Sequence, residues 1–104
     1  MKIIKAITDF GVIDVQTIGK PKEIKGQMWV VAKVPRKYMN AKEPLIMREV
    51  IHYITGANLP IRNIKYNATA KAMLEAAEDW LNIMKITFED AAREVKQYEI
   101  LNKN

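Results

Sequence analysis

Residues 20–42 are the part of the chain whose side chains most clearly suggest a chemistry, which is contact with phosphates. The stretch contains one anion, Glu23, and seven cations: Lys20, Lys22, Lys25, Lys33, Arg36, Lys37 and Lys42. Closely spaced cations bind phosphates by releasing condensed counterions, and the affinity falls as salt rises. Trp29 and Tyr38 lie in the same stretch, and aromatic rings beside lysines can stack on bases. The stretch therefore predicts a nucleic-acid-binding surface of these seven cations with Trp29 and Tyr38.

A second pattern, Asp14 followed by Glu23-Ile24-Lys25, has the residue types of a metal-dependent nuclease site. In such a site two carboxylates hold Mg²⁺ and a lysine steadies the attacking water. The site needs rigid adjacent strands. Pro21 and Gly26 instead predict a loop around Glu23 and Lys25. Because so short a pattern also arises by chance, it does not predict a nuclease.

The chain has one histidine, His52, and no cysteine. This composition excludes disulfides, thiolate metal sites and paired-histidine ligand sets. Glu49 and Tyr53 lie close to His52 in sequence, but no nearby Ser, Cys or Asp completes a catalytic set. The four glycines form no nucleotide-binding fingerprint. We therefore predict a protein that is not an enzyme and that holds no metal or cofactor.

The charges divide the chain into two parts. Residues 1–66 contain 12 cations and 5 anions, whereas residues 67–104 contain 5 cations and 7 anions. The first part is rich in Ile and Val, and the second is rich in Ala, Glu and Lys without Gly or Pro. This order predicts strands first and helices later. At 104 residues the chain has the usual length of one domain, so we predict a single α+β domain over residues 1–104.

Three strands are predicted, over residues 2–8, 12–18 and 27–34. A short connection at residues 9–11 joins the first two as a hairpin, and residues 19–26 form a basic loop. In the third strand, alternation places Met28, Val30, Ala32 and Val34 on the core face. Trp29 and Lys33 then lie together on the opposite, exposed face. Residues 61–66 suit either a short fourth strand or a packed loop.

Three helices are predicted after the sheet. The first begins at Glu43 or Pro44 and ends at Gly56, with an apolar stripe of Ile46, Met47, Val50, Ile51 and Ile54. The second covers about residues 68–84, and the third covers residues 87–101. These last two are expected to pack as an antiparallel hairpin. Residues 102–104 are polar and are expected to fray. The predicted fold is therefore a three-stranded or four-stranded antiparallel sheet followed by three helices, which cover one face of the sheet.

These observations predict a small protein that binds nucleic acid through its basic sheet and loops, largely without regard to base sequence. The predicted last helix carries more anions than cations and would repel phosphate, so a helix-turn-helix reader is not expected. The alternative is a phage or mobile-element type of inhibitor that binds an acidic protein through the same surface. The helices could also join copies of the chain into a homo-oligomer. No signal peptide or membrane span is predicted, which favours a cytoplasmic location.

Overall fold

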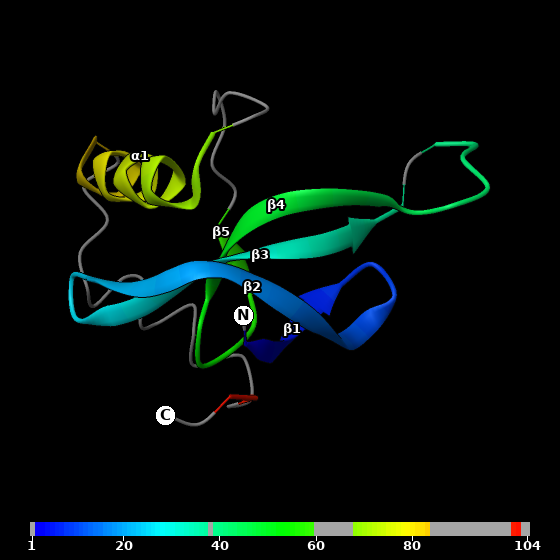
Figure 1. Cartoon of the computed structure of the whole chain (residues 1–104), viewed down its shortest axis with the longest axis horizontal. Coiled ribbons are helices and arrows are strands. Elements are labelled where there is room, and N and C mark those ends of the chain that lie inside the picture. The colour runs from blue at the N-terminus through cyan, green and yellow to red at the C-terminus, as the bar shows by residue number, and fades with distance from the viewer. Residues whose placement is uncertain (1, 38, 60–67, 84–100, 103–104) are drawn as a thin grey trace.

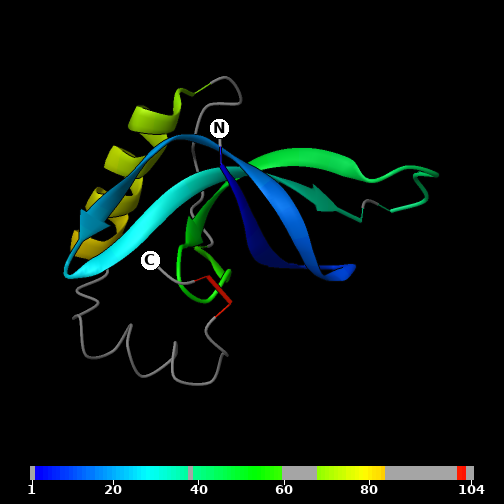
Figure 2. The same cartoon turned by 60° about the horizontal axis from the view of Figure 1, so that its bottom comes forward.

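The computed structural model describes residues 2–37, 39–59, 68–83 and 101–102. Within them the chain forms one antiparallel sheet of five strands, in the order β1-β2-β3-β4-β5, and one helix (Figure 1). The elements are β1 (Ile3–Thr8), β2 (Gly11–Ile24), β3 (Gln27–Arg36), β4 (Leu45–His52), β5 (Asn58–Leu59) and α1 (Ala70–Ile83). The sheet curls into a half-barrel, and α1 lies against one of its faces (Figure 2).

The predicted fold, with three strands followed by three helices, is wrong. The segment predicted as the first helix forms β4, which pairs along its length with β3. The predicted helix over residues 68–84 is confirmed as α1. It is the only helix among the described residues, so they contain no helical hairpin, and the predicted third helix lies outside them except for Leu101. Residues 58–59 form β5, and residues 61–66 lie outside the described part.

Burial on both faces explains why the sequence of β4 predicts a helix. Val50 and Ile51 point to opposite faces of the sheet, and both are buried, as are His52 and Tyr53 beyond them. The start of the strand, Leu45–Met47, is exposed on both faces. Because neither half alternates between buried and exposed positions, the strand lacks the period of two that identifies a half-buried strand.

The predicted basic loop at residues 19–26 is mostly strand. β2 continues to Ile24, with an irregular register between Ile18 and Lys22. Lys25 and Gly26 alone make the turn into β3, with φ values of 52° and 82°. Two positive φ values are what a two-residue hairpin turn with the right-handed twist of its strands requires. Lys20 and Lys22 are therefore held on a strand and not in a loop.

Two apolar clusters lie on opposite faces of the sheet. The inner one, inside the curl, contains Ile4, Ala6, Val15, Val30, Ala32, Val34, Ile51 and Tyr53. The outer one lies between the sheet and α1 and contains Ile24, Trp29, Val31, Val50, Met73, Leu74, Ala77 and Leu81. α1 covers only the part of the outer face around Trp29, and Lys33 further along β3 stays exposed.

The free edge of β1 is hydrogen-bonded to two segments that are distant in sequence, the turn after β4 and Asn102. The Ile7 N–H donates to the Gly56 carbonyl at 2.9 Å, and the Lys5 N–H donates to Asn102 Oδ1 at 2.8 Å. The Asn102 amide also donates to the Tyr53 carbonyl at 2.7 Å. Gly56 has a φ of +72°, and a Cβ there would lie 2.7 Å from the Lys5 carbonyl oxygen. The expectation that Asn102 frays is therefore wrong, since its side chain bridges β1 and the turn after β4.

Candidate nucleic-acid interface

Three lysines, from two segments that are distant in sequence, line a hollow of about 360 Å³ between β2 and the beginning of α1. They are Lys20 and Lys22 of β2 and Lys71 of α1. Lys22 pairs with Glu78 across 3.6 Å, and Glu75 also lines the hollow. Within the described residues, Lys20 and Lys71 have no carboxylate partner. The hollow therefore has an excess of positive charge that the fold leaves open to a ligand.

Packing of α1 on the sheet brings these lysines together. The helix begins after Thr69, whose hydroxyl accepts from the Ala72 N–H at 3.1 Å as an N-terminal cap. Its apolar side chains then enter the outer cluster. Gly19 permits the close approach of β2, because a Cβ there would lie 3.2 Å from the Ala70 Cβ. Lys20 and Lys22 were predicted as binding residues, whereas Lys71 was missed because it belongs to the net acidic part of the chain.

A second basic group lies at the tip of the sheet, in a hollow of about 240 Å³ between the β1–β2 turn and the β3–β4 loop. Lys37 and Lys42 line it, together with Phe10, Ala41, Glu43 and Pro44. The Lys37 ammonium lies 5.4 Å from the centre of the Phe10 ring, within the range of a cation–π contact. The Phe10 residue is 45% exposed. The structure thus places an accessible aromatic ring beside two predicted binding cations.

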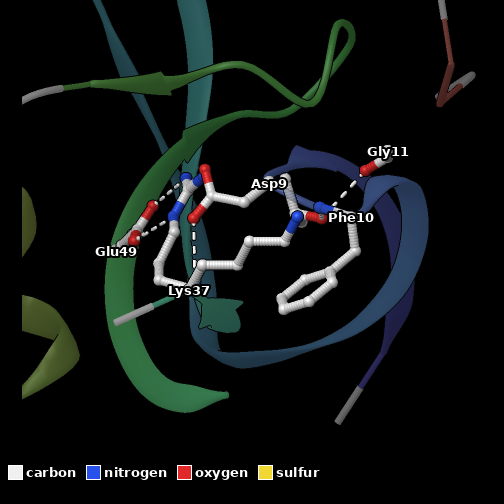
Figure 3. A network of polar contacts seen from close by, with 7 residues as sticks. Asp9, Phe10, Gly11, Lys37 and Glu49 are labelled. Carbon is white, nitrogen blue, oxygen red and sulfur yellow. Dashed lines mark hydrogen bonds and ion pairs between the residues drawn. The ribbon is translucent and has the colours of Figure 1, made fainter. Parts of the chain in front are cut away.

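Arg36, another predicted binding residue, forms hydrogen bonds with carboxylates of the fold itself. Its Nε and Nη2 donate to the two carboxylate oxygens of Glu49 at 2.7 and 2.5 Å (Figure 3). Its Nη1 lies 3.5 Å from an oxygen of Asp9, whose other oxygen accepts from the Lys37 N–H at 2.9 Å. The hydrogen bonds with Glu49 raise the pKa of Arg36. We call Arg36, Glu49 and Asp9 the clasp, because they join the β1–β2 turn to β3 and β4.

The remaining predicted cations lie apart from both hollows. Lys33 is exposed on β3 directly opposite Arg48 of β4, so two cations share the part of the outer face that α1 leaves open. Lys25 is exposed in the turn between β2 and β3. The exposed predicted cations are therefore divided into a group beside α1, a group at the sheet tip, Lys33 on the outer face and Lys25 in the β2–β3 turn.

Trp29, one of the two predicted stacking rings, is not on this surface. Trp29 is 5% exposed and packs in the outer cluster, with its ring edge-on to His52 at 4.9 Å between centroids. The expectation that Trp29 is exposed beside Lys33 is therefore wrong, because α1 covers the Trp29 end of the strand and not the Lys33 end. Tyr38 lies outside the described residues. Phe10 lies in the predicted connection at residues 9–11, and strand periodicity does not predict where the ring of a turn residue lies.

His52 is buried, and each of its ring nitrogens has a hydrogen-bond partner. Its Nε2 lies 2.6 Å from Gln27 Oε1 and its Nδ1 lies 2.9 Å from Thr55 Oγ1. Because the amide oxygen can only accept, Nε2 carries the proton and Nδ1 accepts from the Thr55 hydroxyl. That hydroxyl oxygen in turn accepts from the Ala57 N–H at 3.3 Å. Burial lowers the pKa of His52, which favours this neutral form. Both ring nitrogens are thus engaged within the fold.

The nuclease-like residues do not converge. Asp14 and Glu23 lie on the same strand, β2, nine positions apart, which corresponds to about 30 Å along an extended chain. Asp14 instead pairs with Lys5 at 3.2 Å. Among the described residues no group of His, Cys, Asp or Glu could hold a metal ion. The described residues therefore do not bring Asp14, Glu23 and Lys25 together as the nuclease pattern would require.

No known protein family, curated protein or solved structure matches this chain. In the part of the chain that the structure describes, α1 is too short and too polar to cross a membrane.

Proposed function

We propose that this chain binds the phosphate backbone of nucleic acids, without sequence specificity and without catalysis. The observation that supports this proposal is the hollow between β2 and α1. There Lys20 and Lys71, which have no carboxylate partner among the described residues, converge with Lys22. The overall charge of +5 adds a long-range attraction for polyanions. A base-reading element, such as a helix with cations along its exposed face, is not seen in the described residues, because α1 exposes Glu75 and Asp79 as well as Lys71.

The physical basis is the release of counterions from the nucleic acid. Each phosphate that a lysine neutralises contributes about 0.7 to 0.9 to the slope of log affinity against log salt. The three lysines of the hollow alone correspond to a slope of about −2 to −3. Lys33, Lys37 and Lys42 can add to this value wherever the nucleic acid also reaches them.

The test compares three variants that each remove one positive charge: Lys20→Gln, Lys71→Gln and Lys5→Gln. Lys5 is the matched control, because it pairs with Asp14 away from the hollow. Fluorescence anisotropy of a labelled oligonucleotide gives the affinity between about 50 and 200 mM salt, where phosphate contacts are strongly weakened. We expect the first two variants to lose affinity several-fold and to lower the slope by about 0.8 each. Absence of binding at low salt, or an equal effect of Lys5→Gln, would contradict the proposal.

A separate observation favours the alternative function of binding a protein partner. Leu45, Ile46 and Met47 are consecutive in β4 and all three are exposed, which is unusual for a surface that meets only water. This alternative predicts no oligonucleotide binding even at low salt. The proposed self-association through helices gains no support from the apolar stripe of α1, because Met73, Leu74, Ala77 and Leu81 are buried on the sheet. Sedimentation equilibrium would test self-association directly.

A further inference from the structure

We propose that the hollow at the sheet tip binds one unpaired nucleobase, which stacks on the ring of Phe10 while Lys37 and Lys42 contact the neighbouring phosphates. The inference rests on the proposed function and makes it more specific. The preferred ligand is a single-stranded nucleic acid, because the bases of a duplex are stacked on one another and a protein ring cannot reach their faces.

The backbone around Phe10 is held in place before any ligand arrives. The Phe10 N–H donates to the Thr8 hydroxyl at 3.0 Å, and that hydroxyl donates to the Gly11 carbonyl at 2.9 Å. Asp9, the residue between Thr8 and Phe10, is bonded to both Arg36 and the Lys37 backbone (Figure 3). A backbone held in this way loses little conformational freedom on binding, which favours affinity.

The environment of the ring suits a flat group with a negative charge nearby. The Lys37 ammonium lies over one face of the Phe10 ring at 5.4 Å, so a base must stack on the opposite face or displace that ammonium. Lys42 lines the same hollow, and the two ammonium groups are then available to phosphates next to the stacked base. Among the described residues, Glu43 is the one anion that lines it. At about 240 Å³ the hollow is smaller than the roughly 300 to 1,000 Å³ of sites that enclose small molecules. It can therefore contact one face of a planar ring without enclosing a whole nucleotide.

This arrangement replaces the stacking ring that the sequence suggested. Trp29 lies in the predicted basic strand but is buried, whereas Phe10 is distant in sequence from Lys37 and Lys42 and is exposed beside them. A cation–π contact that serves only to stabilise the turn is the competing explanation for the Lys37–Phe10 pair. The two explanations differ in whether removal of the ring changes the affinity for bases.

The experiment uses the full chain and three probes with the same number of phosphates: an oligothymidylate, an abasic strand and a DNA duplex. Anisotropy gives the affinity of each at one low salt concentration. We expect the oligothymidylate to bind about tenfold more tightly than the abasic strand, the contribution of one stacked base. Phe10→Leu should remove this difference without weakening the binding of the abasic strand, and Phe10→Tyr should keep it. Ile3→Ala, which alters an exposed apolar residue on β1 that does not line the hollow, is the control and should leave all three affinities unchanged.

The outcomes separate this inference from the proposed function. Equal binding of oligothymidylate and abasic strand by the unaltered chain would overturn the inference and leave phosphate binding intact. A discrimination that persists in Phe10→Leu would also overturn it, because the base would then be recognised elsewhere. Failure of all three probes to bind would overturn the proposed function and this inference together. Thermal unfolding of each variant shows whether the fold is preserved.

Discussion

The clasp should contribute far more to stability than an exposed ion pair of the same chemistry. Arg36 and Glu49 form two short hydrogen bonds, and their side chains are 19% and 15% exposed. Lys5 and Asp14 form a single contact of 3.2 Å, with side chains 55% and 64% exposed. The same protein therefore offers a largely buried, bidentate pair and a solvated one for direct comparison.

The expected magnitude follows from these two geometries. Exposed ion pairs contribute about 0 to 1 kcal/mol, whereas removal of one partner from a fully buried pair costs about 3 to 5 kcal/mol. The pair of Arg36 and Glu49 lies between these limits, so Arg36→Met should lower the free energy of unfolding by about 2 to 3 kcal/mol. Much of that loss reflects the Glu49 carboxylate that remains buried without its partner.

A double-mutant cycle with Arg36→Met and Glu49→Gln isolates the interaction between the two side chains. Urea unfolding followed by tryptophan fluorescence gives the free energy of each variant. We expect a coupling energy of about 1.5 to 2.5 kcal/mol for this pair and below about 0.5 kcal/mol for a control cycle of Lys5→Met and Asp14→Asn. The reasoning would be refuted if both cycles gave the same small coupling, because burial and bidentate geometry would then have no effect.

Two further predictions concern the interior. Burial lowers the pKa of His52 below its ordinary value of 6.5, so the fold favours the neutral ring. The contribution of His52 to the free energy of unfolding is therefore present above about pH 6.5. It falls as the pH drops, by at most about 1.4 kcal/mol per pH unit. Urea midpoints from pH 7.5 to 5 should show this fall, and His52→Gln should show less of it; identical profiles would contradict the prediction. Gly56→Ala should cost more than about 2 kcal/mol and Gly11→Ala about 1 kcal/mol, because both have positive φ but only Gly56 faces backbone atoms within 3 Å. Equal losses in thermal unfolding would show that the contact with β1 is unimportant.

Elements with one buried and one solvent-exposed face could be predicted from the spacing of their apolar residues. α1 has a single buried stripe through Met73, Ala77 and Leu81, and the spacing of three to four residues is visible in the sequence. The β1–β2 hairpin was also predicted, from two apolar segments around Gly11. In both cases the pattern reflects one neighbouring layer, and local sequence is enough to show which side faces it.

Burial on both faces of a strand could not be predicted in this way: the strand now seen as β3 was expected with Trp29 exposed, and the segment of β4 was expected to be a helix. β3 and the end of β4 are buried on the inner face by the curl of the sheet and on the outer face by α1. Burial on both sides removes the alternation, and the spacing of Ile46, Met47, Val50, Ile51 and Ile54 then imitates a helical stripe. The packing of α1, which is distant in sequence, thus gives the segment of β4 an apolar pattern that is typical of a helix.

By itself the sequence determined the excess of positive charge, its concentration before residue 43, the absence of cysteine and the position of α1. Only the tertiary structure decided which of those side chains are available to a ligand. It buried Trp29, engaged Arg36 with Glu49, and brought Lys71 to Lys20 and Phe10 to Lys37. The physical reason is that charge belongs to each residue alone, whereas exposure and proximity depend on which distant segment packs against it.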